Sequence, residues 1–233
     1  MTNRLTNYDW PALETELDRY GNARLPELLQ PDECQALIDS YADRQRFRSQ
    51  VIMQRHGFGQ GEYQYFDEPL PELIGTLRAQ LYQRLVPLAN RWSQRLGFEH
   101  RYPKAHADFI AHCHAAGQTK PTPLLLRYGK DDYNCLHQDL YGPLAFPLQL
   151  TVMLSQPGED FSGGEFTLVE QRPHRQSRPD VVSLQHGDAV IFAGQYRPVA
   201  GTRGDYRVTL RHGVSRVHGG ERFTLGLIFH DAQ

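Results

Sequence analysis

The sequence predicts an α+β protein with a mainly β core, in which a helical layer supports an antiparallel double sheet. Two observations carry this prediction. Apolar residues recur at helical spacing through the first hundred residues, and from about residue 120 onward eight short β-type runs alternate with Gly, Pro, Asp and Asn. Strands do not alternate with helices, so a doubly wound parallel sheet is not expected.

Three helices are predicted in the first part of the chain. Residues 11–20 carry an i,i+4 apolar pair, and a second helix begins with the Pro-Asp-Glu of residues 31–33 and runs to about residue 42. A longer helix begins near residue 71 and ends at Gly97. Pro87 lies inside it and should kink or split it, because proline lacks the N–H that the helix needs.

Short strands account for most of the remaining chain. One or two are expected within residues 47–66, around a glycine-bearing turn. The eight later runs are residues 123–128, 133–139, 147–155, 164–170, 181–184, 189–192, 205–212 and 223–230. We therefore expect one domain, with residues 1–104 as helical support containing short strands and residues 105–233 as the β core.

Composition excludes several classes of protein. Lys and Arg number 25 and Asp and Glu 27, so a formal net charge of -2 argues against a strongly basic nucleic-acid binder but permits a local basic patch. Cys34, Cys113 and Cys135 are widely separated, so neither a disulfide framework nor a cysteine-rich zinc site is expected. With no apolar stretch of signal-peptide or membrane-spanning length, the expectation is a cytoplasmic protein without membrane contact.

The most specific local pattern is His137-Gln138-Asp139. In a strand, residues i and i+2 point to the same face, so His137 and Asp139 would project together. They would supply two ligands of a 2-His-1-carboxylate site for Fe(II), which leaves coordination positions open. A satisfied surface pair is the alternative explanation of such a motif on its own.

Residues from distant strands can complete this site. His212 ends a β-type run and could be the third ligand. Ten residues later, Arg222 and Thr224 share one face of another run. An arginine fork beside a hydroxyl group suits a carboxylate, so these residues could hold the far end of a dicarboxylate that chelates the metal.

In their order, these motifs resemble the Fe(II)/2-oxoglutarate-dependent dioxygenase superfamily. The combination is HxD, Gly-Gly-Glu-Phe at residues 163–166, Gly-Asp-Ala-Val-Ile-Phe at 187–192, and a histidine with an arginine ten residues on. The resemblance covers about residues 123–231. It implies a double-stranded β-helix (jelly roll) and the cofactors Fe(II), 2-oxoglutarate and O2. The implied iron ligands are His137, Asp139 and His212, and the implied 2-oxoglutarate residues are Arg222, Thr224 and Tyr128.

Residues 124–142, 197–208 and 212–232 resemble more closely a prokaryotic oxygenase family that is described as acting on damaged nucleic-acid bases by oxidative demethylation. This implies a damaged or single-stranded nucleic acid as partner. The ten-residue His-to-Arg spacing is instead similar to that of prolyl hydroxylases, so a hydroxylase of a protein side chain or a small molecule is the alternative. A jelly-roll module that binds metal without turnover is a third hypothesis, which the intact motif disfavours.

Substrate contacts are expected from Tyr133, Tyr141 and Arg197. Residues 172–222 contain nine arginines against four acidic residues and could meet a phosphate backbone, or could form a solvated face. The histidines beside Cys113, which are His106, His112 and His114, could bind zinc but are expected to line a pocket or the surface.

Overall fold

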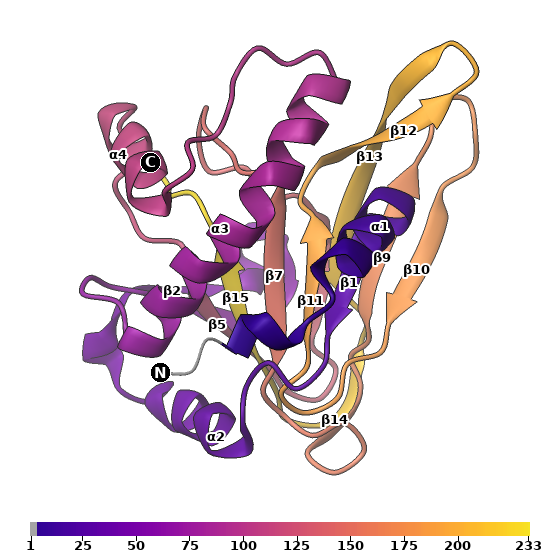
Figure 1. The fold of residues 1–233 in the computed structure, drawn as a ribbon. Helices are drawn as coiled ribbons and strands as arrows, with labels where there is room; N and C mark the ends of the chain where they lie inside the picture. The colour runs from indigo at the N-terminus through magenta and orange to yellow at the C-terminus, as the bar shows by residue number, and fades with distance from the viewer. Residues whose placement is uncertain (1–3) are drawn as a thin grey trace.

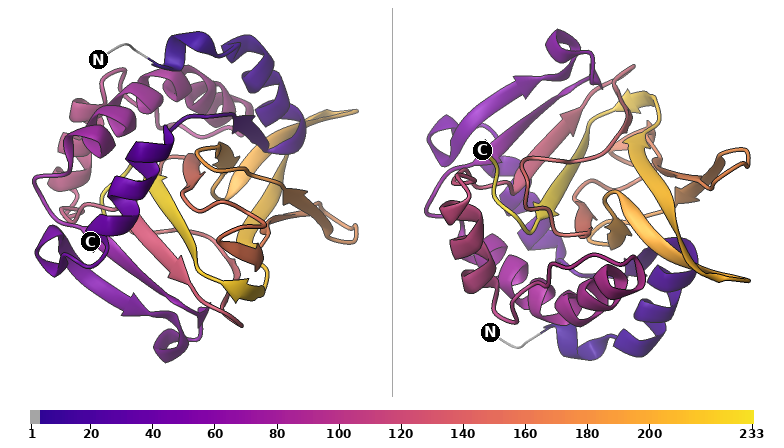
Figure 2. Two further views of the ribbon diagram at one scale, coloured as in Figure 1. Left: turned by 90° about the horizontal axis from the view of Figure 1, so that it is seen from below. Right: turned by 90° about the horizontal axis from the view of Figure 1, so that it is seen from above.

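Two antiparallel sheets form the core of the computed structural model, which describes residues 4–233 (Figures 1 and 2). The larger sheet has the strand order β1-β11-β7-β15-β5-β4-β2. Its strands are β1 Asn22–Leu25, β2 Phe47–Ile52, β4 Glu62–Phe66, β5 Leu124–Tyr128, β7 Leu148–Met153, β11 Ala189–Ala193 and β15 Arg222–Ile228. The mainly β, antiparallel prediction is therefore confirmed.

The smaller sheet has the order β10-β9-β13-β6-β3, with β12 paired to β13. Its strands are β3 Gly59–Gln60, β6 Tyr133–His137, β9 Phe166–Gln171, β10 Arg178–Val182, β12 Tyr196–Gly201 and β13 Gly204–Val214. A separate ribbon pairs β8 Phe161–Gly163 with β14 Val217–Gly220. Each of the eight predicted later runs overlaps a strand, whereas β1, β8, β12 and β14 were not predicted.

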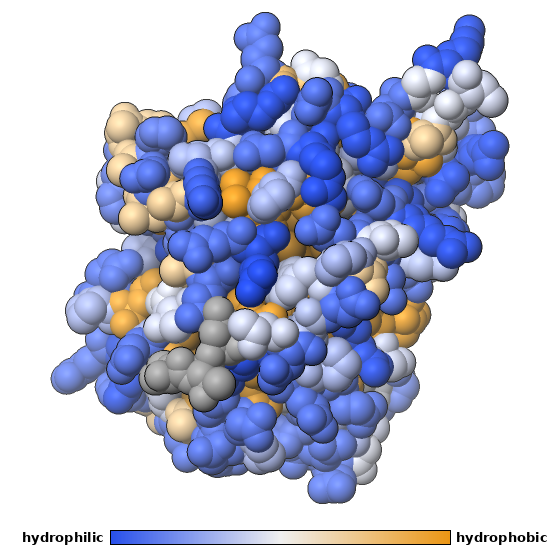
Figure 3. All heavy atoms as spheres, viewed as in Figure 1, coloured by the Kyte–Doolittle hydropathy of each residue, from blue (hydrophilic) through white to orange (hydrophobic). Residues whose placement is uncertain are grey.

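Helices cover the outer face of the larger sheet, where α3 crosses in front of β7 and β15 (Figure 1). The helices are α1 Trp10–Tyr20, α2 Pro31–Ser40, α3 Glu72–Arg95 and α4 His106–Ala115, with short 3-10 turns η1 Arg4–Asn7, η2 Arg44–Arg46 and η3 Met53–His56. The helix α4 was not predicted. The same face is mostly hydrophilic, with only small apolar areas between the elements (Figure 3). No helix among residues 4–233 is long and apolar enough to cross a membrane.

The prediction that Pro87 would split the third helix is wrong, because α3 runs from Glu72 to Arg95 without interruption. Proline removes the hydrogen bond to the carbonyl of Gln83, four residues earlier. Both Pro87 and Gln83 lie on the exposed side of α3, where water can satisfy that carbonyl. Leu85 and Leu88 are fully buried on the opposite side, so packing holds the helix together.

The N-terminal residues extend both sheets as well as supplying helices. Strand β1 pairs with β11, β4 pairs with β5, and β3 pairs with β6. The main apolar core accordingly joins helix residues such as Leu77 and Leu81 to sheet residues such as Leu150 and Leu227. The two parts of the chain thus share one core.

A buried arginine of α3 anchors the C-terminal segment. The Arg78 guanidinium donates to the carbonyls of Ile228 and His230 at 2.8 and 3.1 Å, and to Asp231 Oδ1 at 2.8 Å. Both members of the Arg78–Asp231 ion pair are almost completely buried. Because solvent hardly reaches either side chain, the Arg78 cation and the Asp231 carboxylate neutralise each other.

We expect Arg78→Ala to lower the free energy of unfolding by about 3–5 kcal/mol, because it leaves the Asp231 carboxylate buried without its cation. Urea denaturation monitored by circular dichroism measures the change. Arg46→Ala, which breaks the exposed pair with Asp43, is the control and should cost less than about 1 kcal/mol. A similar, small loss in both variants would contradict the anchoring role.

Candidate active site

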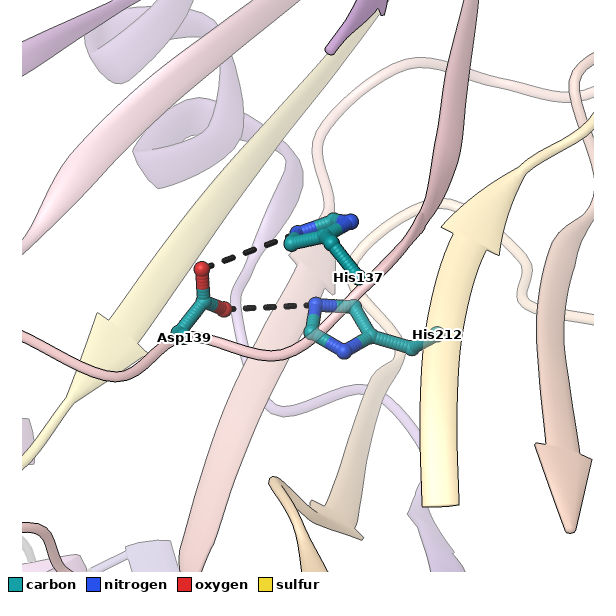
Figure 4. A group of neighbouring side chains, drawn as sticks. All are labelled: His137, Asp139 and His212. Atoms are coloured by element: carbon teal, nitrogen blue, oxygen red, sulfur yellow. Dashed lines mark ion pairs between the residues drawn. The ribbon is translucent and has the colours of Figure 1, made fainter. Parts of the chain in front are cut away.

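Three side chains converge between the sheets: His137, Asp139 and His212 (Figure 4). His137 ends β6, Asp139 follows two residues later, and His212 lies on β13. One ligand atom of each lies within 4.8 Å of those of the other two. His137 and His212 are direct Cα partners across the antiparallel strand pair, which explains how residues 75 positions apart meet.

An irregularity in the pairing of β6 with β13 helps to position the residues of the site. The β6–β13 register shifts by one residue between His212 and Val214, because β6 carries one extra residue. Gly213 lies at this point, and a Cβ there would come within 2.7 Å of the Asn134 carbonyl oxygen. Glycine thus allows the close approach, and both Asn134 and His137 can line the same cavity.

Hydrogen bonding orients the imidazoles for metal binding. His137 Nδ1 lies 2.7 Å from the Cys135 carbonyl oxygen, which can only accept, so Nδ1 donates this hydrogen bond and Nε2 is the ring nitrogen that faces the site. His137 Nε2 lies 3.6 Å from Asp139 Oδ1, and His212 Nε2 lies 3.3 Å from Asp139 Oδ2. Burial lowers the pKa of His212, which favours the neutral, ligating form of the ring.

Neighbouring polar groups hold the Asp139 carboxylate in place. The Tyr141 hydroxyl donates to Oδ1 at 2.7 Å and itself accepts from the Tyr65 hydroxyl at 2.9 Å. Gln149 Nε2 donates to Oδ2 at 3.0 Å. Burial opposes ionisation, but hydrogen bonding with His212 and Tyr141 outweighs it and holds the pKa of Asp139 well below its usual range. The site therefore presents one ionised carboxylate and two imidazoles, the donor set of a non-heme Fe(II) centre with open positions.

A buried cation lies in the same cavity. Arg222 on β15 is 1% exposed, and none of its three guanidinium nitrogens has a hydrogen-bond partner among residues 4–233. Its guanidinium carbon lies 5.3 Å from the centre of the Tyr128 ring. Burial lowers the pKa of Arg222 to about 10, so the side chain is still a cation at neutral pH. An unpaired buried cation is costly, which indicates that an anionic ligand belongs beside it.

Both sheets line this metal cavity, whose volume is about 410 Å³. The smaller sheet contributes the histidines, and the larger sheet contributes Arg222, Thr224 and Tyr128. Thr224 is buried two residues from Arg222, as strand alternation predicts, and the Tyr128 hydroxyl lies 3.2 Å from Asn134 Nδ2. We call His137, Asp139 and His212 together the metal group. The arrangement fits a dicarboxylate that reaches from the metal group to the Arg222 guanidinium.

The three residues expected to contact substrate have different surroundings. Tyr141 lines the metal cavity, but its hydroxyl is engaged with Asp139. Tyr133 is 38% exposed and is not part of the cavity lining. The expectation for Arg197 needs correction: it is 1% exposed, donates to Glu170 and to the Asp18 carbonyl, and lies outside the lining. The Arg197 guanidinium instead balances the negative charge of the buried Glu170 carboxylate.

The other candidate ligands and cations also have structural partners. His106 Nε2 lies 2.8 Å from the Phe229 carbonyl oxygen, and His114 Nε2 lies 2.8 Å from Asp231. Among residues 4–233, only the His137 group gathers enough ligand atoms for a metal. In the arginine-rich segment, Arg172 and Arg178 join Arg197 at Glu170, so part of its positive charge is already paired.

Sequence reasoning missed Gln149, Asn134 and Tyr65. Gln149 had a readable signal. It is the only amide in the fully buried strand β7, whose other residues are apolar except for one threonine. Asn134 and Tyr65 had none, because their importance depends on the register shift in β6 and on the approach of β4 to the segment after β6.

We expect His212→Ala to abolish stoichiometric binding of Mn(II) or Co(II), because two remaining ligands cannot hold the ion. Equilibrium dialysis with metal analysis measures the stoichiometry. His112→Ala, at an exposed position of α4, is the matched control and should bind metal as the native protein does. Loss of metal binding in the control alone would show that the metal site lies on α4 instead.

The sequence also matches known proteins. A family model named Oxygenase-NA, described as an oxygenase catalysing oxidative methylation of damaged DNA, matches residues 61–232. Two uncharacterized proteins from strains of Mycobacterium tuberculosis are each 49% identical to this chain over 167 residues, which is 72% of either length.

Solved structures share the fold at low sequence identity. A prolyl-4-hydroxylase from Pseudomonas putida superposes with a TM-score of 0.56 at 15% identity, over 96% of this chain and 99% of that one. An oxidoreductase of the 2OG-Fe(II) oxygenase family from Burkholderia pseudomallei gives a TM-score of 0.56 at 17% identity, over 97% and 93%. The jelly-roll prediction is thereby confirmed. With the family match over most of its length, the chain is an oxidoreductase that belongs to the Oxygenase-NA family, and it shares its fold with an oxidoreductase of the 2OG-Fe(II) oxygenase family.

Proposed function

We propose that this oxygenase removes N-linked alkyl groups from damaged bases of single-stranded nucleic acid by hydroxylation. Its cofactors are Fe(II), 2-oxoglutarate and O2. The observation that carries the chemistry is the unpartnered, buried Arg222 in the same cavity as the His-Asp-His group. For the substrate, support comes from the description of the family, which names damaged DNA.

In this proposal His137, Asp139 and His212 would hold the iron, and Arg222 would pair with the distal carboxylate of 2-oxoglutarate. Thr224 and Tyr128 bound the same end of the cavity. When bound, iron and 2-oxoglutarate supply the oxidation: 2-oxoglutarate becomes succinate and CO2, and one oxygen atom of O2 enters a substrate C–H bond. On an N-methyl group the product is N–CH2OH, whose C–N bond breaks to release formaldehyde and restore the N–H.

The chain's own residues orient this chemistry. Tyr141 and Gln149 each bind one oxygen of the Asp139 carboxylate, which limits its rotation and fixes the direction it offers to the metal. Burial raises the pKa of Tyr141 well above its usual value, so its hydroxyl stays a donor at neutral pH. Apolar groups such as Leu126, Phe166 and Phe192 line the cavity and exclude bulk water from it.

The rim of the cavity suits an aromatic substrate. Phe58, Leu136 and Leu140 line it and are each 45–48% exposed, which is unusual for large apolar side chains. The His56 ring stacks on Phe58 with centroids 5.3 Å apart and an interplanar angle of 21°. Unstacked bases bind such surfaces irrespective of sequence.

A prolyl-type hydroxylase is the second candidate. The ten residues between His212 and Arg222 favour it, as does the fold shared with the prolyl-4-hydroxylase over nearly the whole chain. A metal-binding module without turnover is disfavoured, because a buried cation without a partner has no use in such a module.

Incubation with Fe(II), 2-oxoglutarate and O2 tests the substrate. We expect formaldehyde and succinate in equal amounts from a single-stranded oligonucleotide that contains 1-methyladenine, and binding that weakens as salt is added. An unmethylated oligonucleotide, a proline-containing peptide and a metabolite mixture are the comparison arms. Succinate formed only with the peptide or a metabolite would replace the nucleic-acid proposal with the hydroxylase one.

We expect Arg222→Met to have two opposite effects. Loss of the charge-assisted contact should weaken 2-oxoglutarate binding by about 2–4 kcal/mol, roughly 30- to 1,000-fold, in the Mn(II)-loaded protein. In the absence of ligands, removal of an unpaired buried cation should raise the free energy of unfolding by about 1–3 kcal/mol. Calorimetric titration and urea denaturation measure the two quantities.

Arg216→Met is the matched control, because Arg216 is exposed and pairs with Asp131 at 2.8 Å. It should change neither quantity appreciably. Unaltered 2-oxoglutarate affinity in Arg222→Met would exclude Arg222 as the anchor.

A further inference from the structure

A second cavity, of about 280 Å³, adjoins the metal cavity. The two share three lining residues, Asp139, Leu140 and Gln149. One of these is a ligand of the proposed iron site, and another is hydrogen-bonded to that ligand. A group that fills the second cavity as far as this shared wall would therefore lie one ligand away from the metal.

Aromatic rings make up much of the wall of this second, aromatic cavity. Phe98 and His100 stack with centroids 5.4 Å apart and an interplanar angle of 19°. The Tyr102 ring meets His100 edge to face at 5.2 Å, and Trp92 and Tyr196 also line the space. The volume lies just below the range of about 300–1,000 Å³ for drug-sized ligands, as suits one planar ring system.

Polar atoms are few and neutral apart from one carboxylate. His100 Nε2 lies 3.3 Å from Ser93 Oγ and 3.1 Å from the Tyr102 hydroxyl. Burial and the neighbouring Arg101 lower the pKa of His100, so its ring is neutral. Among the described lining residues, the sole charged side chain is Asp139. Aromatic faces without a cationic side chain among the lining residues favour a planar cation over an anion.

A basic residue lies beside this cavity. The Arg207 guanidinium carbon lies 4.4 Å from the centre of the Tyr196 ring, and no carboxylate among residues 4–233 forms an ion pair with it. Tyr196 is part of the lining, whereas Arg207 is exposed. A cation in this place can meet the phosphate next to a base that has left its stack.

We propose that the aromatic cavity receives the alkylated base itself, a planar heteroaromatic cation such as 1-methyladenine, with Arg207 at the adjoining phosphate. This assignment rests on the proposed function and adds to it the place where the substrate base is held. Methylation at that ring nitrogen gives the base a positive charge, which the aromatic faces complement. The undamaged base is neutral and gains less from the same surroundings.

Gly194 offers a way to fill the cavity without removing any packing. It lines the aromatic cavity, its φ lies outside the left-handed region, and a Cβ there would meet Gln149 at an ordinary 3.7 Å. Gly194→Leu therefore adds a side chain where the base would lie. Gly219→Leu is the matched control, because Gly219 lies outside both cavities and a Cβ there would meet Ser162 Oγ at 3.8 Å.

The experiment measures binding of a single-stranded trinucleotide with a central 1-methyladenine by calorimetry, with Mn(II) and 2-oxoglutarate present so that no turnover occurs. We expect Gly194→Leu and Phe98→Ala to weaken binding at least about tenfold, since stacking of a single base accounts for that much. Phe98→Tyr, which keeps an aromatic face, and Gly219→Leu should bind like the native protein. Arg207→Ala should weaken binding and make it less dependent on salt.

The affinity for 2-oxoglutarate is measured in the same variants and should stay unchanged. An unchanged affinity would show that the metal cavity is intact. If the native protein binds the trinucleotide and both Gly194→Leu and Phe98→Ala bind it equally well, the cavity assignment is overturned while the proposed function stands. If the native protein binds only a proline-containing peptide, the proposed substrate class fails, and the base assignment fails with it.

Discussion

The site depends on the antiparallel pairing of β6 with β13. This pairing places His137 opposite His212, and their ring centres lie 4.2 Å apart. A slip of one residue would turn one imidazole to the other face of the sheet, and the metal group would be lost. Gly213 is the residue that allows the register to shift where it must, because a side chain there would collide with the backbone of β6. The convergence of the three side chains thus follows from backbone geometry that neither histidine determines alone.

The two sheets have different tasks at this site. Strands of the smaller sheet carry the imidazoles, whereas β15 and β5 of the larger sheet carry Arg222 and Tyr128. The cavity between them can therefore hold a ligand that touches both sheets at once. The protein keeps a buried guanidinium without a hydrogen-bond partner among the described residues, and such a group reduces the stability of the unliganded fold. This cost is typical of a binding site that is formed before its ligand arrives.

The segment after β6 connects the chemistry to the substrate. It contributes Asp139, which the proposed iron site requires, and Leu140, which lines both cavities. Its Tyr141 is in turn hydrogen-bonded to Tyr65 of β4, so an N-terminal strand helps to position a ligand of the C-terminal core. The aromatic cavity likewise combines residues after α3 with residues before β12. Helical support and β core are therefore both needed to build the site.

The sequence by itself determined the mainly β class, the positions of most of the later strands, and the identity of His137, Asp139, His212 and Arg222 as a group. Strand alternation accounts for this, because it fixes which face a side chain takes from sequence spacing alone. Only the tertiary structure decided that Pro87 leaves α3 intact, that Arg197 compensates the buried Glu170, and that Gln149 contacts the metal group. Each of these depends on which surface lies against the residue: solvent beside Pro87, a carboxylate from β9 beside Arg197, and the end of β6 beside Gln149. Such contacts join residues far apart in the chain, and spacing along one strand or helix carries no information about them.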